Sequence, residues 1–136
     1  MTDYVQYHNP LKNPPLEPQP DYFGIYTRKP VGSVKHGDRV WVVTSSRKPR
    51  RYQVVEWFRV SEIEENMPTD ENIVSGNEGA FFRSPLRIDD QPWFADFLKN
   101  QGNFGRGFSP ITERRFIRGL ETAARLPGPA AQAPRR

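Results

Sequence analysis

Two short segments of the chain place polar side chains beside aromatic rings. They are Gln6-Tyr7-His8-Asn9 and Gly24-Ile25-Tyr26-Thr27, and each stands at the end of a predicted strand. Aromatic rings stack on nucleobases, while amide, hydroxyl and imidazole groups hydrogen-bond to the polar edge of a base. Gly24 lacks a side chain and leaves room for a close approach to the backbone. The sequence therefore predicts a ligand-binding pocket lined by Gln6, Tyr7, His8, Asn9, Gly24, Tyr26 and Thr27.

A glycine-rich connector near the C-terminus is the second candidate for this pocket. It contains Asn103 and Phe104, which could line the pocket mouth or only pass over a junction between helices. The first two segments also have a structural interpretation, in which Tyr7 and Tyr26 are core tyrosines and Asn9 caps a turn. Both interpretations predict the same local structure, so only the three-dimensional arrangement separates them.

Positive charge is concentrated in one predicted loop. The chain has 20 Lys and Arg against 16 Asp and Glu, a formal net charge of +4. We predict that the basic residues of this loop contact nucleic-acid phosphates, and they are Arg47, Lys48, Arg50 and Arg51. An acidic stretch follows at residues 62–71, so the charge is polarised along the chain. Solubility is the alternative explanation for such charge runs.

The residue inventory argues against familiar catalytic sites. There is no cysteine, and the two histidines, His8 and His36, lie in separate segments. No nucleophile-elbow, zinc-protease or phosphate-loop motif occurs. Glu62, Glu64 and Glu65 lack further oxygen ligands at loop spacing, so we interpret them as a solvated strand end rather than a cation site. We therefore expect no catalytic residue, no metal and no cofactor, and an enzyme is the last of the alternatives.

Alternating residue patterns predict about six short strands. Residues 38–44 and 51–60 are rich in Val, Trp, Tyr and Phe, and we predict that they form a hairpin closed by a polar loop. Further strands are expected at residues 3–8, 22–27, 72–75 and 80–83, with the last two joined by a hairpin or a bulged turn and residues 86–88 adding an edge segment. One helix is predicted from Pro92 to Lys99, and a second is predicted to be capped by Ser109. The apolar stripe of the second helix is expected to hold Ile111, Phe116, Ile117, Leu120, Ala123 and Ala124.

These elements predict one α+β domain over residues 1–126, a strongly curved sheet or small mixed β-barrel closed by two helices near the C-terminus. The proline-rich segment from Pro10 to Pro20 is expected to be an extended surface loop, and residues 127–136 a disordered tail. No apolar run reaches membrane-spanning length, and no apolar signal core begins the chain. We therefore expect a cytoplasmic protein without a membrane partner.

The order of these segments resembles the PUA-like superfamily of small barrels, which includes PUA, ASCH and EVE domains. The resemblance rests on Gly37-Asp38-Arg39-Val40-Trp41-Val42 before a long second strand. Gly76-Asn77-Glu78-Gly79-Ala80-Phe81-Phe82, followed by the helix that contains Trp93, is similar in order to the EVE branch. The resemblance covers roughly residues 1–100, and neither the proline-rich segment nor the last helix fits it. It implies a pseudobarrel that binds RNA or modified bases in a pocket at the barrel mouth.

Two functions follow as predictions. The first is a non-catalytic nucleic-acid-binding module, with RNA or modified DNA as its ligand. The alternative is a protein-interaction or accessory module that uses the proline-rich segment and aromatic surface. Binding to phosphates weakens steeply with salt, whereas docking of aromatic and proline residues does not, so salt dependence separates the two.

Overall fold

The computed structural model describes residues 1–12, 22–47 and 49–126. The tail at 127–136, most of the proline-rich segment and Lys48 lie outside the described residues, so the predictions that concern them are not addressed by the structure. Among the described helices, none combines the length and the apolar character needed to cross a membrane.

The larger of two sheets has five strands in the order β7-β4-β3-β1-β8. Its strands are β1 (Asp3–His8), β3 (Arg39–Ser46), β4 (Arg51–Arg59), β7 (Glu78–Arg87) and β8 (Phe108–Ile111). The central pair β3 and β4 confirms the predicted hairpin, and Trp41 lies opposite Trp57 in its register. β1 pairs in parallel with β3, so the C-terminal ends of these two strands lie at the same edge of the sheet.

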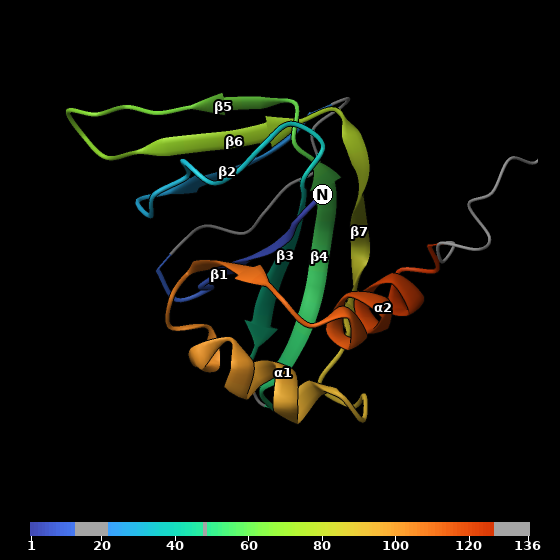
Figure 1. Ribbon diagram of the computed structural model, residues 1–136. Coiled ribbons are helices and arrows are strands. Elements are labelled where there is room, and N and C mark those ends of the chain that lie inside the picture. The colour runs from blue at the N-terminus through green and yellow to red at the C-terminus, as the bar shows by residue number, and fades with distance from the viewer. Residues whose placement is uncertain (13–21, 48, 127–136) are drawn as a thin grey trace, which may run out of the picture.

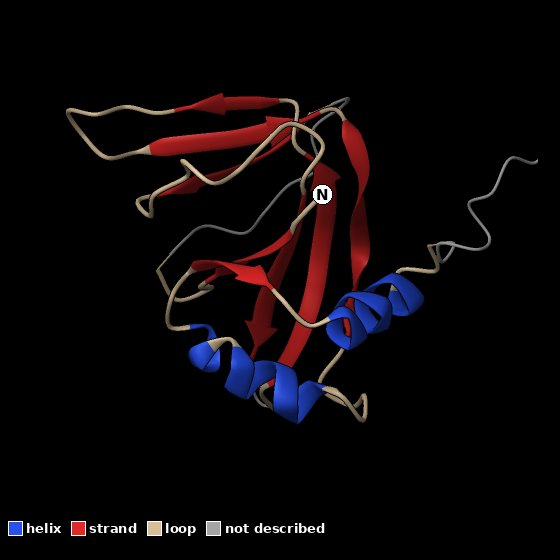
Figure 2. Ribbon diagram, in the orientation of Figure 1, coloured by secondary structure: helices blue, strands red, loops and turns tan. Residues whose placement is uncertain are grey.

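Each face of this sheet is covered by a different layer (Figures 1 and 2). A three-stranded sheet of β2 (Phe23–Thr27), β6 (Asn72–Gly76) and β5 (Glu62–Glu64) covers one face. Two helices, α1 (Phe94–Asn100) and α2 (Arg114–Ala123), and the short turn η1 (Gly102–Phe104) cover the other.

Side chains alternate between these two layers along each strand. On the helical side, Trp41 and Trp57 pack against Phe97 and Phe116. The other side brings Val40 and Phe58 together with Ile25 and Val74 of the smaller sheet. The prediction of an α+β fold is therefore confirmed, but the predicted closed barrel is wrong, because the two sheets remain separate.

The predicted hairpin between residues 72–75 and 80–83 is also wrong. β6 pairs with β2 and β5, whereas β7 pairs with β4, so the chain changes sheets between them. The glycines at this point allow a close approach to β4 rather than a tight turn. A Cβ on Gly76 would lie 1.8 Å from the Arg59 carbonyl oxygen, and one on Gly79 would lie 2.1 Å from the Trp57 carbonyl oxygen.

A strand replaces the predicted N-terminus of the last helix. Ser109 does not cap a helix: it lies in β8 opposite Val5, and its hydroxyl donates a hydrogen bond to the buried Gln101 side chain. Ile111 belongs to β8 as well, while the rest of the predicted stripe lies on or just after α2, which begins at Arg114. This strand positions the preceding glycine-rich connector against the end of β1.

Candidate functional site

A cavity of about 830 Å³ opens where the C-terminal ends of β1 and β3 meet the glycine-rich connector. We call it the Tyr7 pocket. Its lining residues come from three distant parts of the chain: Tyr7, Asn9, Pro10, Leu11 and Lys12; Ser45, Arg47 and Arg50; Asn103, Phe104, Gly105 and Gly107. The parallel pairing of β1 with β3 joins the first two groups, and the pairing of β8 with β1 brings in the third.

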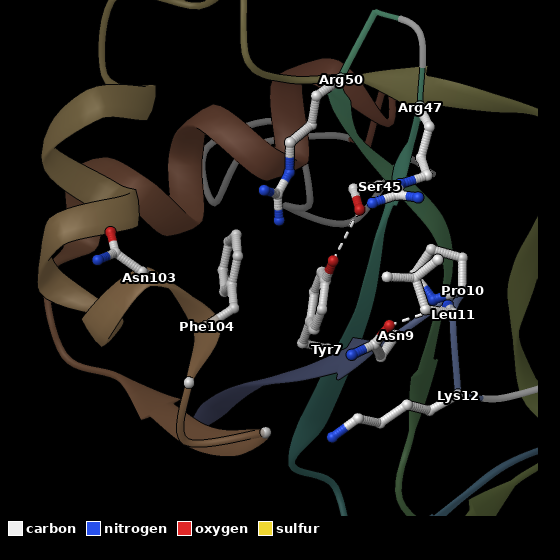
Figure 3. Close-up of a pocket in the computed structure, with 12 residues that line it drawn as sticks. Tyr7, Asn9, Pro10, Leu11, Lys12, Ser45, Arg47, Arg50, Asn103 and Phe104 are labelled. Atoms are coloured by element: carbon white, nitrogen blue, oxygen red, sulfur yellow. Dashed lines mark hydrogen bonds between the residues drawn. The ribbon is translucent and has the colours of Figure 1, made fainter.

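Aromatic rings form the inner wall of the Tyr7 pocket. The rings of Tyr7 and Phe104 stack with their centroids 5.4 Å apart and their planes 3° from parallel. Tyr52 of β4 packs against both, at 6.4 Å from Tyr7 and 5.5 Å from Phe104. The Tyr7 hydroxyl lies 2.7 Å from the Ser45 hydroxyl, and this hydrogen bond fixes the ring relative to β3 (Figure 3).

The backbone that presents Phe104 has an unusual conformation. Gly102, Asn103 and Phe104 have φ values of 59°, 57° and 62°, in the left-handed region. A bulky aromatic residue rarely adopts this conformation, and such outliers concentrate at functional sites. The neighbouring structure holds it in place: the Phe104 N–H donates to the Gln101 carbonyl at 3.0 Å, and the Gly107 carbonyl accepts from the Tyr7 N–H at 2.7 Å.

Three cationic side chains line the same pocket. Arg47 and Arg50 come from the β3–β4 loop and Lys12 from the segment after β1. The Arg50 guanidinium lies 5.2 Å from the Tyr52 ring centroid, a cation–π contact that holds it over the aromatic wall. Figure 3 shows Arg50 above the edges of the Tyr7 and Phe104 rings and Arg47 beside Ser45. None of the described lining residues carries a carboxylate, so the described lining has a net positive charge.

Asn9 has a structural role as well as a place in the lining. Its side-chain oxygen accepts a hydrogen bond from the Leu11 N–H at 2.9 Å, which closes a local turn after β1. The turn directs Pro10 and Leu11 toward the side of the Tyr7 ring opposite Phe104 (Figure 3). The turn-capping interpretation of Asn9 is thus confirmed, and the same turn places its side chain in the pocket wall.

The other predicted pocket residues lie elsewhere. Gly24, Tyr26 and Thr27 belong to β2 in the smaller sheet, and Tyr26 is 73% exposed. β2 pairs with β6, whereas β1 pairs with β3 and β8, and none of these three β2 residues lines the Tyr7 pocket. The Tyr22 ring fills the space beside Gly24, where a Cβ would lie 2.9 Å from the Tyr22 hydroxyl oxygen.

The side chains of Gln6 and His8 project from the face of β1 opposite Tyr7, because side chains alternate along a strand. The Gln6 side-chain amide donates to the Tyr26 carbonyl at 3.3 Å, so Gln6 faces the smaller sheet. The His8 carbonyl accepts a hydrogen bond from the Thr44 hydroxyl at 2.8 Å. Neither residue lines the Tyr7 pocket, so the predicted set is split between the two faces of β1.

Only some of the described residues of the predicted basic cluster line the Tyr7 pocket. Arg47 and Arg50 line the Tyr7 pocket, whereas Arg51 is exposed at the start of β4 and does not. Lys12 and Ser45 were not among the predicted site residues. Ser45 lies two residues after Val43 on β3, so the two side chains share one face of the strand. Because Val43 is paired with Tyr7, this alternation could have indicated that Ser45 lies beside Tyr7.

Searches against protein-family models, curated proteins and solved structures found no match for this chain. The resemblance to the PUA-like superfamily therefore stays a prediction.

Proposed function

We propose that this chain is a nucleic-acid-binding module that receives a nucleotide in the Tyr7 pocket. The observation that carries the proposal is the joining of an aromatic wall to three cationic side chains, with no carboxylate among the described lining residues. Arg47 and Arg50 bind phosphate groups, and the base packs against the Tyr7 side of the wall. This division of labour matches single-strand recognition, in which cations follow the backbone and aromatic rings receive bases.

The dimensions of the pocket support a ligand of nucleotide size. Its volume of about 830 Å³ lies within the range of roughly 300–1,000 Å³ that is typical of small-molecule sites. Asn9 and Asn103 supply amide groups at its wall, and an amide can both donate to and accept from the edge of a base. The described lining residues include amides, hydroxyls and cations that suit binding, so we assign binding rather than catalysis to the pocket.

The proposal is tested by fluorescence anisotropy with labelled single-stranded RNA and DNA, with and without modified bases, over a range of salt concentrations. Arg50→Gln removes one cation from the pocket. We expect weaker binding and a plot of log affinity against log salt that is flatter by about 0.7 of a unit for the lost phosphate contact. Arg51→Gln is the matched control, since it removes the same charge from the adjacent residue, which begins β4 and does not line the pocket.

A second pair of variants tests stacking. Tyr7→Leu should weaken binding by about 1–3 kcal/mol, the usual contribution of an aromatic ring that receives a base. Tyr26→Ala removes an exposed tyrosine that does not line the pocket and should leave affinity unchanged. Circular dichroism confirms that each variant is folded.

Two results would count against the proposal. Equal losses for Arg50→Gln and Arg51→Gln would mean that general charge, and not the pocket, attracts nucleic acid. Absence of oligonucleotide binding, together with salt-insensitive binding of a protein partner to the proline-rich segment, would favour the protein-interaction alternative.

A further inference from the structure

A buried ion-pair network lies at the opposite end of β1 and β3 from the Tyr7 pocket. Arg39 is only 2% exposed, and its guanidinium lies 2.7 Å from a carboxylate oxygen of Asp3 and 2.7 Å from one of Glu121. Asp3 also accepts a hydrogen bond from the Trp41 indole at 2.8 Å. Both carboxylates thus contact the same buried guanidinium, and this group of one cation and two anions has a formal net charge of −1.

A cavity of about 150 Å³ adjoins this network, and we call it the Arg118 cavity. Its lining residues are Met1, Asp3, Arg39, Arg59, Arg114, Ile117, Arg118 and Glu121. Four arginines and two carboxylates give the lining an excess of two positive charges. The volume is far smaller than that of the Tyr7 pocket and suits a single small anion rather than a nucleotide.

Arg114 and Arg118 stand one turn apart on α2, where like charges repel each other. Within the described parts of the chain neither forms an ion pair, and the contact of Arg59 with Glu78 is long, at 3.5 Å. Arg59 is held in position by a hydrogen bond of 3.2 Å to the Gly37 carbonyl. Three arginines thus surround one small space whose carboxylates already bind Arg39.

The neighbouring Arg115 provides a contrast on the same helix. It does not line the cavity, and its guanidinium pairs with Glu113 at 2.9 Å and with Asp96 at 3.1 Å. These carboxylates raise the pKa of Arg115, with the hydrogen bond to Glu113 as the largest contribution. Arg115 is therefore paired with two carboxylates, whereas Arg114 and Arg118, which line the cavity, form no ion pair within the described residues.

We propose that the Arg118 cavity binds a phosphate group, with Arg114, Arg118 and Arg59 as its donors. Arginine guanidinium groups match the geometry of phosphate oxygens and form charge-assisted hydrogen bonds to them. The bound anion relieves the repulsion between Arg114 and Arg118. The phosphate group belongs either to free inorganic phosphate or to a nucleic-acid strand, and the site is separate from the Tyr7 pocket.

The first experiment follows the arginine side-chain N–H signals by NMR while inorganic phosphate is added at constant ionic strength. We expect saturable shifts of the Arg114 and Arg118 signals. Arg118→Gln should weaken phosphate binding roughly tenfold, as expected for loss of one charge-assisted hydrogen bond. Arg115→Gln removes an equal charge from the same helix and should leave the phosphate response unchanged. Since Arg118 is exposed, the variant should fold normally.

A second experiment distinguishes the source of the phosphate and separates this site from the proposed function. Phosphate shifts that persist in Arg50→Gln assign the site to the Arg118 cavity, whatever the Tyr7 pocket binds. If inorganic phosphate causes no shift but Arg118→Gln weakens oligonucleotide binding and Arg115→Gln does not, the ligand is a strand phosphate. If neither probe responds to Arg118→Gln, or if both variants have equal effects, the proposal is wrong.

Discussion

Glu56 carries a carboxyl group that is buried in the sheet, and its replacement tests the fold. It lies in β4 opposite Val42 of β3 and Phe81 of β7, on the same face as Phe58, and is only 6% exposed. Burial raises the pKa of Glu56 from 4.5 to about 7, because the charged form loses its hydration. Glu56→Gln keeps the shape of the side chain and removes the titration.

The size of the effect follows from linkage between protonation and folding. The folded state holds the proton more tightly, so stability from the neutral carboxyl is full below pH 4.5 and is lost as the pH rises to about 7. A shift from 4.5 to about 7 corresponds to roughly 3 kcal/mol, at about 1.4 kcal/mol for each pKa unit. Glu56→Gln should therefore match the wild type below pH 4.5 and be more stable by up to about 3 kcal/mol above pH 7.

Urea denaturation over this pH range measures the difference directly, with equal m-values as the check that both proteins unfold in the same way. Glu62→Gln is the control, since Glu62 is exposed on β5 and its loss should leave the pH profile as in the wild type. The reasoning is refuted if Glu56→Gln is less stable than the wild type at high pH. Parallel pH profiles for Glu56→Gln and the wild type would refute it equally.

Three further predictions concern core packing, close backbone approach and the buried ion pairs of Arg39. Trp41→Ala should cost about 3–5 kcal/mol in urea denaturation, because a fully buried ring leaves a cavity, and a loss within error would mean that the ring is exposed. Gly76→Ala should lower the melting temperature, since its Cβ would meet the Arg59 carbonyl at 1.8 Å; Gly32→Ala, where nothing lies within 4 Å, is the control. Asp3→Ala should destabilise by about 3 kcal/mol because Arg39 stays buried with one carboxylate fewer, and an unchanged melting temperature would contradict the buried network.

Local sequence patterns predicted the centre of this fold well. The strands predicted at residues 38–44 and 51–60 are found at 39–46 and 51–59, because each strand carries its alternating pattern within itself. The path of the chain after β6 could not be predicted in this way. Gly76 and Gly79 are needed because the chain passes close to the β4 backbone. The residues around these glycines do not indicate which other strand lies against them, so this contact could not be predicted from the local sequence.

β8 was missed for a related reason. Ser109 and Pro110 are good helix-start residues, but pairing with β1 outweighs that preference, and four residues are too few to show an alternation. The helix begins only at Arg114. The local signal correctly predicted a helix near the C-terminus, but the pairing of β8 with β1 moves its start from Ser109 to Arg114.

The candidate site was predicted in part. Tyr7, Asn9, Asn103 and Phe104 come together with Arg47 and Arg50 because β1 pairs with β3 on one side and β8 on the other. Tyr26 was assigned to the same pocket on the assumption that strands adjacent in sequence are adjacent in space. β1 and β2 do lie close together, since the Gln6 amide donates to the Tyr26 carbonyl at 3.3 Å, but this contact is on the face of β1 opposite Tyr7 and the two strands belong to different sheets.

The central claim is that the Tyr7 pocket binds a nucleotide, and chemical-shift mapping by NMR with a short single-stranded oligonucleotide tests it most directly. We predict that the largest backbone shifts occur at Tyr7, Ser45, Phe104 and Gly105, with smaller shifts along β2. Shifts confined to β2 around Tyr26, or no shifts at oligonucleotide concentrations well above those of the protein, would contradict it.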